Sequence, residues 1–264
     1  MNPDHARSEA FLRLLGLMAR LREENGCPWD RKQTPASLKP FLIEECFEVI
    51  DAIDEGSPPK IREELGDLLF QIVFHARIAE EQGEFDIADV LTTIREKMVR
   101  RHPHVFGTAQ AATDREVLAN WEEIKKREKG GEPQSVLEGV PKTLPSLLRA
   151  HKIQERAARV GFDWNHLNEV LPKLDEEISE FKASLAEQNA EKIEEELGDL
   201  FFTLVNVARF VDVDPEQALR KTISKFVRRF RIIEERAAGV GKSLKDMTLD
   251  EMEKIWQESK QDEA

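Results

Sequence analysis

The sequence has few of the residues and patterns that mark fibrous, disordered or membrane proteins. Its 264 residues include only 12 Pro and 13 Gly, without any extended low-complexity run, which excludes the collagen-like and intrinsically disordered classes. Acidic residues interrupt the apolar positions of the first 25 residues, at Asp4, Glu9, Glu23 and Glu24. We therefore expect no signal peptide, no membrane span and a cytoplasmic protein.

Cysteine is also scarce, and the two cysteines, Cys27 and Cys46, lack CxxC spacing. Cys46 lies within an apolar helical pattern, in which a buried and reduced thiol is the common outcome. We therefore predict that Cys46 is buried, and we assign neither cysteine a redox or zinc-binding role.

The charge balance is acidic, because 52 Asp and Glu face 39 Lys and Arg and give a formal net charge of −13. Such a surface repels phosphate backbones and anionic lipids. We expect neither nucleic acid nor a membrane as a partner.

Apolar residues recur at spacings of three and four, and no segment alternates with period two, which predicts an all-α fold. Helix-start signals, an N-cap residue followed by Pro or a capping box, occur at Thr34-Pro35, Ser57-Pro58, Asp214-Pro215 and Thr248 with Glu251. The pattern predicts helices near 6–24, 37–55, 59–82, 87–101, 114–128, 145–159, 167–187, 190–211, 215–237 and 248–260.

Helix-breaking residues gather in one place, between Glu128 and Leu147, where the sequence contains Gly130, Gly131, Pro133, Gly139, Pro141 and Pro145. This density predicts a linker. We therefore expect a first domain at residues 1–128, a linker at 129–144 and a second domain at 145–264.

The two sides of this linker repeat each other. The block Glu44–Glu48 matches Glu176–Glu180, and Lys60–Asp67 matches Lys192–Asp199, both at an offset of 132 residues. A third block recurs at an offset of 128, with Lys97 and Arg101 in the first copy and Lys225 and Arg229 in the second. The first copy therefore has four extra residues between its second and third blocks. Trp121 and Trp256 are a further candidate match. Two copies of this length indicate a duplicated helical unit rather than a solenoid.

Carboxylates occupy a narrow polar stripe in each copy. Glu196, Asp199, Thr203 and Asn206 share one side of an otherwise apolar helix, and so do Glu64, Asp67, Gln71 and His75. A helix that is apolar nearly all round is buried, so we expect these carboxylates in or beside a bundle interior. A solvated acidic face is the alternative interpretation.

The preceding helix of each copy adds two carboxylates one turn apart, Glu177 with Glu180 and Glu45 with Glu48. Adjacent antiparallel helices would bring four carboxylates together. An all-oxygen cluster suits Mg²⁺ better than zinc. A di-iron bundle requires Glu-x-x-His, and no Glu precedes any of the six histidines by three positions.

At this level the sequence resembles the MazG family of all-α nucleoside triphosphate pyrophosphohydrolases. The resemblance rests on EExxE followed by ExxD in both copies, on Cys27–Asp30, on Arg101–Phe106 and on the block with Lys225 and Arg229. It implies a duplicated MazG-like helical bundle completed by homodimerisation. It also implies Mg²⁺-dependent hydrolysis of an NTP or dNTP to the monophosphate and pyrophosphate.

The candidate catalytic residues of the second copy are Glu176, Glu177, Glu180, Glu196 and Asp199. The last four would hold Mg²⁺, and Glu176 or a neighbouring carboxylate would orient the attacking water. The candidate nucleotide- and phosphate-binding residues are Lys173, Glu176, Lys192, Glu195, Lys225, Arg229 and Trp256. The alternatives are surface ion pairs for the lysines, a solvated basic face for Lys225 and Arg229, and core packing for Trp256.

The first copy supplies a second candidate site with Glu44, Glu45, Glu48, Glu64, Asp67, Lys97 and Arg101. Because Phe41 stands where the second copy has Lys173, we expect the second copy to carry most of the turnover. A pyrophosphatase specialised for one nucleotide such as dUTP, and a non-enzymatic helical interaction module that binds a regulatory cation, remain alternatives at this stage.

Overall fold

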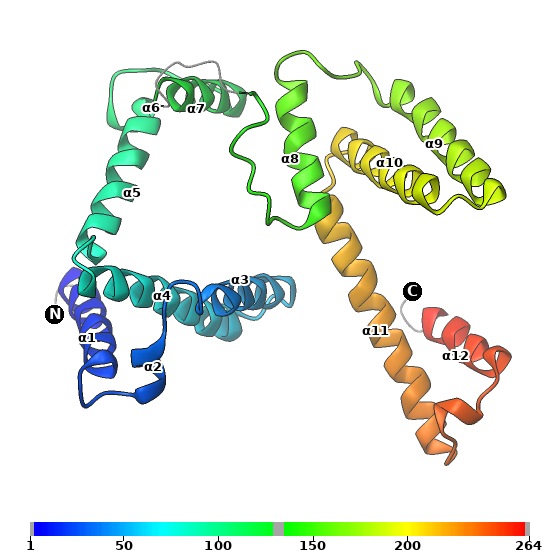
Figure 1. Ribbon diagram of the computed structural model, residues 1–264, viewed down its shortest axis with the longest axis horizontal. Helices are drawn as coiled ribbons and strands as arrows, with labels where there is room; N and C mark the ends of the chain where they lie inside the picture. Colours follow the sequence, from blue (N-terminus) through cyan, green and yellow to red (C-terminus); the bar gives the residue numbers. More distant parts are fainter. Residues whose placement is uncertain (1–2, 129–134, 262–264) are drawn as a thin grey trace. The chain divides into compact units, whose positions relative to one another are not determined.

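The computed structural model describes residues 3–128 and 135–261, and every regular element in these ranges is helical (Figure 1). The all-α prediction is confirmed. None of the described helices is long and apolar enough to cross a bilayer. The helices are α1 (Pro3–Arg22), α2 (Pro28–Lys32), α3 (Lys39–Asp54), α4 (Pro58–Glu81), α5 (Ile87–Arg101), α6 (Pro103–Phe106), α7 (Asp114–Glu128), α8 (Ser146–Ala158), α9 (Leu167–Glu187), α10 (Ala190–Phe210), α11 (Pro215–Gly239), the 3₁₀ turn η1 (Leu244–Asp246) and α12 (Leu249–Gln261).

The chain divides into two compact units, residues 1–132 and 133–264. The predicted linker, 129–144, includes residues 129–134, which lie outside the described residues. Three short elements, α2, α6 and η1, were not predicted, since each has too few residues to show a helical period.

In the first unit, α3 and α4 lie side by side as a helical hairpin, and α1 packs against α4 (Figure 1). The core of this unit consists of Met18 of α1, Leu38 beside α3, and three side chains of α4, Val73, Phe74 and Ile78. These side chains occupy the part of α4 that meets α1. The carboxylates of the polar stripe, Glu64 and Asp67, lie nearer the start of α4.

In the second unit, α9 and α10 form the corresponding hairpin, while α8 packs on α10 and α12 packs on α11 (Figure 1). The turn between α9 and α10 is tight, because Gln188 has a φ of 56° and Asn189 caps α10. The Asn189 Oδ1 accepts hydrogen bonds from the backbone N–H groups of Glu191 and Lys192, at 3.1 and 3.3 Å. This cap fixes where α10 begins and so sets the register of its polar stripe against α9.

The predicted helix starts are confirmed in part. Asp214 caps α11, and Thr248 with Glu251 forms the expected reciprocal hydrogen bonds at the start of α12. Thr34 caps a turn before α3 and not the helix itself: its Oγ1 accepts a hydrogen bond from the Ser37 N–H at 3.2 Å, and α3 begins at Lys39. Pro40 has no N–H to donate to a preceding turn of helix, so it is accommodated in the first turn of α3 rather than in its interior.

The prediction that Cys46 is buried is wrong, since its thiol is exposed. Cys46 lies on α3 among exposed apolar side chains such as Ile43 and Ile50, at 55% and 39% exposure. A hairpin partner covers one side of a helix, and the described part of this unit provides no second layer over this side. For the same reason, α4 and α10 are not buried all round, and they expose Leu65, Leu69, Ile72, Phe201, Phe202 and Leu204.

A half-buried ion-pair network fastens α1 to the end of α4. The Arg22 guanidinium, 7% exposed, lies 2.8 Å from Glu81, and Arg77 Nε donates to the same carboxylate at 2.9 Å. Arg22 also lies over the Phe74 ring, 5.4 Å from its centroid. Hydrogen bonds from Arg22, and then from Arg77, hold the pKa of Glu81 below its usual value, although burial opposes this.

We predict that Glu81→Gln lowers the free energy of unfolding by about 2 kcal/mol at pH 7, because it leaves Arg22 without its charged partner. A carboxylate with a depressed pKa stabilises the fold above its unfolded-state pKa, and this stabilisation is lost as the pH falls through the folded-state value. Urea unfolding should therefore show that Glu81→Gln is less stable than the unaltered chain at pH 7, but not at about pH 3.

The control for this prediction is Glu80→Gln, which removes a more exposed carboxylate 3.1 Å from Arg77 and should change stability by less than about 0.5 kcal/mol. Equal stability of Glu81→Gln and the unaltered chain at pH 7 would contradict the assigned role.

Candidate functional site

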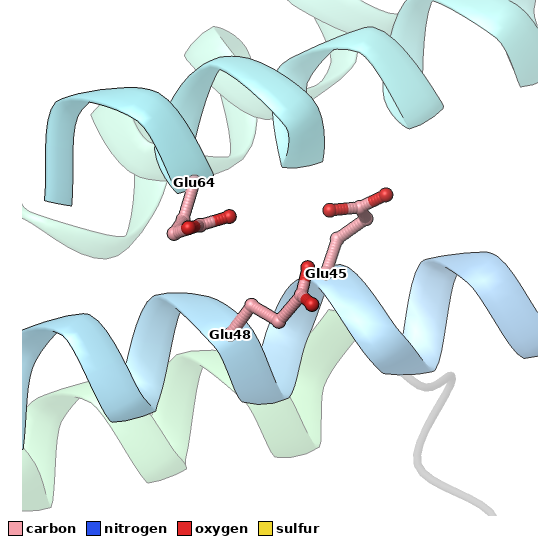
Figure 2. A group of neighbouring side chains, drawn as sticks. All are labelled: Glu45, Glu48 and Glu64. Carbon is pink, nitrogen blue, oxygen red and sulfur yellow. The ribbon is translucent and has the colours of Figure 1, made fainter. Parts of the chain in front are cut away.

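Three carboxylates of the first unit meet between α3 and α4. Glu45 and Glu48 rise one turn apart from α3 toward Glu64 of α4 (Figure 2). One carboxylate oxygen of each lies within 4.8 Å of those of the other two. Helical periodicity puts Glu45 and Glu48 on one side of α3, and the hairpin brings Glu64 opposite them.

The second unit repeats this arrangement with Glu177 and Glu180 of α9 and Glu196 of α10, whose oxygens also lie within 4.8 Å of one another. Glu177 is buried, with 5% exposure. The predicted fourth carboxylates, Asp67 and Asp199, are exposed and are not members of these three-carboxylate groups.

The carboxylates of each group disfavour one another's ionisation. Burial, followed by the charges of Asp67 and Glu48, raises the pKa of Glu45. Burial, followed by neighbouring carboxylates, of which Glu48 and Glu180 respectively act most strongly, likewise raises the pKa of Glu64 and that of Glu196. Asp67 and Asp199 thus act on the groups through their charge.

Carboxylates that lie close together in a partly buried site must either take up protons or bind a cation. The donor set in each copy consists of carboxylate oxygens alone, which is the set preferred by hard divalent ions such as Mg²⁺. The residues present therefore fit a magnesium site. Burial is the largest cause of the raised pKa values of Glu45, Glu64 and Glu196, and the negative charge of the neighbouring carboxylates is the next, which a cation would offset.

Lys173 is the cation that the second copy adds beside its carboxylate group. Its Nζ lies 2.9 Å from Glu177 and 3.0 Å from Glu176. Hydrogen bonds to Glu177 and then to Glu176 raise the pKa of Lys173 well above its usual value. At the matching position of the first copy, Phe41 packs against the core and meets the Trp29 ring at 5.6 Å.

Lys192 points elsewhere. Its Nζ lies 2.8 Å from Glu187, at the end of α9, and this contact raises the pKa of Lys192. Lys60 makes the matching ion pair with Glu55 in the first unit. Both lysines therefore fasten the hairpin turn, which agrees with the alternative of a surface ion pair. The nearby candidates Glu44 and Glu195 are exposed.

The blocks of Lys and Arg pack against the last helix of each unit. Arg229 of α11 lies over the Trp256 ring at 5.7 Å, and Arg101 of α5 lies over the Trp121 ring at 5.6 Å. Arg101 also donates to Glu128 at 2.5 Å. The candidate lysines of the two blocks are Lys225, which is exposed, and Lys97, which is half-buried.

The Arg–Trp geometry is the same in both copies, so Trp121 and Trp256 are structural counterparts. Trp256 also lies 5.1 Å from the Phe226 ring, within the contact between α11 and α12. Arg101 thus contacts α7, and Trp256 is packed between Arg229 and Phe226 of α11.

Two buried glutamines were not among the candidate residues. Gln71 of α4 lies close enough to Glu45 to lower its pKa, against the stronger effect of burial, and Gln154 of α8 donates through Nε2 to the Phe202 carbonyl at 2.8 Å. Gln71 lies on the polar stripe that the sequence shows. Gln154 belongs to no motif, and only the packing of α8 on α10 brings it to the Phe202 carbonyl.

Comparison with known proteins agrees with this duplication. A family model described as the MazG nucleotide pyrophosphohydrolase domain matches residues 33–106 and 166–231. The nucleoside triphosphate pyrophosphohydrolase/pyrophosphatase MazG of Thermotoga maritima is 46% identical over 250 residues, 95% of this chain and 95% of that protein. The nucleoside triphosphate pyrophosphohydrolase of Escherichia coli (strain K12) is 48% identical over 255 residues, 95% of this chain and 97% of that protein.

A crystal structure of a mazG-related protein from Thermotoga maritima is 28% identical, with a TM-score of 0.38, and the match covers 43% of this chain and 97% of that one. The two segments matched by the family model contain one carboxylate group each, Glu45, Glu48 and Glu64 in the first and Glu177, Glu180 and Glu196 in the second. With both copies matched and relatives of nearly half identity over almost the full length, the chain belongs to the MazG nucleotide pyrophosphohydrolase domain family.

Proposed function

We propose that this chain hydrolyses nucleoside and deoxynucleoside triphosphates to the monophosphate and pyrophosphate in a Mg²⁺-dependent reaction. The coarse class, a hydrolase that acts on phosphoric anhydrides, follows from family membership. The observation that carries the finer proposal is the recurrence of the same three-carboxylate group in both units.

In the second copy, Glu177, Glu180 and Glu196 would hold Mg²⁺, with Asp199 one turn beyond Glu196 as a further ligand. When bound, the ion supplies charge neutralisation at the phosphate oxygens and a lowered pKa for the attacking water. Glu176 is exposed beside this group and within reach of Lys173, and we assign it the orientation of that water.

Lys173 is the cation best placed to meet the triphosphate. It already lies at the edge of the carboxylate group, 2.9 Å from Glu177, and its long flexible side chain can turn toward an incoming phosphate. A positioned cation stabilises the charge that develops on departing pyrophosphate. We assign Lys225 and Arg229 to the same task in the assembled protein, and we propose that Trp256 stacks on the base, a contact that tolerates every base.

A homodimer is part of this proposal, because each hairpin keeps an apolar side uncovered within the described residues. On α10, Phe201, Phe202 and Leu204 are 52%, 44% and 44% exposed. A second copy of the chain would bury such a side as the other half of a four-helix bundle. We propose a cytoplasmic homodimer that accepts nucleoside triphosphates with broad base specificity.

We predict that Glu180→Ala and Asp199→Ala each lower kcat/KM by at least about a hundredfold, because each removes a metal ligand without opening an apolar cavity. Circular dichroism should show unchanged helicity. The control is Glu194→Ala, which should retain activity because it removes an exposed carboxylate of α10 that lies away from the polar stripe. Full turnover in both ligand variants would refute the site.

The oligomeric state is a separate prediction. Sedimentation should give about twice the chain mass of 30.3 kDa, and Phe201→Glu should shift the chain toward monomer, since it places a charge on the exposed apolar side of α10. A monomer that keeps full activity at micromolar concentration would contradict the homodimer.

The two copies should also be unequal. The second has Lys173 where the first has Phe41, and the loss of one well-placed phosphate contact costs on the order of a hundredfold in rate. Glu180→Ala should therefore reduce turnover far more than Glu48→Ala does, in parallel assays with the same nucleotide. A larger loss in the Glu48 variant would reverse the assignment.

A further inference from the structure

The carboxylates assigned to Mg²⁺ and the cations assigned to the triphosphate lie on different helices of the second unit. Glu177, Glu180 and Glu196 meet between α9 and α10. Arg229 of α11 instead lies over the Trp256 ring of α12. Helix α11 packs on α8 and α12, and it leads away from the α9–α10 hairpin (Figure 1). The two halves of the proposed site are therefore carried on diverging helices.

The positions of these side chains along their helices enlarge the separation. Asp199 lies eleven residues before Phe210, the last residue of α10, which is about 16 Å of helix. Lys225 lies ten residues after Pro215, the first residue of α11, which is about 15 Å of helix. Both sets of side chains are thus far from the connection between the two helices, where α10 and α11 are closest along the chain.

The charges of α11 and of the α9–α10 hairpin are complementary. Helix α11 contains seven Lys and Arg against three Glu, and the stretch from Arg220 to Arg231 contains no acidic residue. Helices α9 and α10 together contain eleven Asp and Glu against four Lys and Arg. Opposite charges at this density favour the encounter of two surfaces and fix which part of one meets which part of the other.

Helix α11 also has an apolar stripe that the described residues leave uncovered. Its members are between 44% and 55% exposed and recur at helical spacing: Leu219, Ile223, Phe226 and Val227. Helical periodicity places Lys225 and Arg229 along one flank of this stripe. The hairpin exposes apolar side chains of its own on α10. Apolar surface bordered by opposite charges on both sides is typical of an interface with an apolar centre and a polar rim.

We propose that the site of the second copy is shared between two copies of the chain. Helix α11 of one protomer docks on the α9–α10 hairpin of the other, so that Lys225 and Arg229 of the first face the carboxylate group of the second. Trp256 accompanies them, because it packs between Arg229 and Phe226. This inference rests on the proposed function and adds which protomer supplies which half of the site. The homodimer is then a requirement of the reaction, since neither protomer completes a site by itself.

The test uses heterodimers of two differently tagged full-length chains, purified through both tags. Every chain carries Glu48→Ala, so that turnover reports the second copy. In the split heterodimer, one chain carries Glu180→Ala and the other carries Lys225→Ala with Arg229→Gln. A shared site predicts about half the turnover of the dimer with Glu48→Ala alone, because one of its two sites keeps both halves. In the joint heterodimer, one chain carries all three of these changes. Its turnover should be lower by at least about a hundredfold, because each site then lacks one half.

The two heterodimers contain the same substitutions, so a general effect on folding or association lowers both equally. A site within one chain gives the reverse pattern, with activity in the joint heterodimer and none in the split one. That pattern, or equal turnover of the two, would overturn the inference. Arg231→Gln removes an exposed cation on the opposite side of α11 from Arg229, and this control should leave turnover within about twofold. Failure of the proposed function is read separately, as the absence of monophosphate and pyrophosphate from the unaltered chain.

Discussion

Mutual repulsion among three carboxylates held within 4.8 Å is the constraint on which the arrangement of each unit depends. If α10 began at another residue, its carboxylate would no longer face those of α9. The cap and the ion pair at the hairpin turn therefore help to hold the carboxylates together. Asn189 sets the start of α10, and Lys192 holds Glu187 at the end of α9. The local structure thus maintains an unfavourable charge concentration that a divalent cation would relieve.

The duplication separates what the carboxylate group requires from what has diverged around it. Three Glu and a tight hairpin recur in both units, and so does the Arg–Trp contact of the last helices. The surroundings differ. The second unit has Lys173 beside its carboxylates, while the first unit has Phe41 at this position, and Phe41 packs against the core. At this position the first unit has a packed aromatic side chain, while the second has a cation at its carboxylates.

Helical periodicity was sufficient for the all-α fold and for the carboxylates that meet, because helix geometry alone brings residues three and four apart onto one side. The matching blocks at a fixed offset were sufficient for the duplication. Burial was harder to predict. Cys46 looked like a core residue, yet the described part of the first unit provides no layer over its side of α3. The direction of Lys192 and the placement of Arg229 against Trp256 depend on which side chains tertiary packing brings near. Gln154 carries no periodic or motif signal, so its contact with α10 emerges only from the packed helices.

The most direct measurement is the product balance when the purified chain is incubated with each nucleoside triphosphate, with Mg²⁺ and with a chelator in its place. A carboxylate group that holds Mg²⁺ for pyrophosphohydrolysis should yield nucleoside monophosphate and pyrophosphate in equal amounts, and the chelator should abolish both products. Nucleoside diphosphate with inorganic phosphate, products that persist in the chelator, or no product from any nucleotide would contradict the central claim.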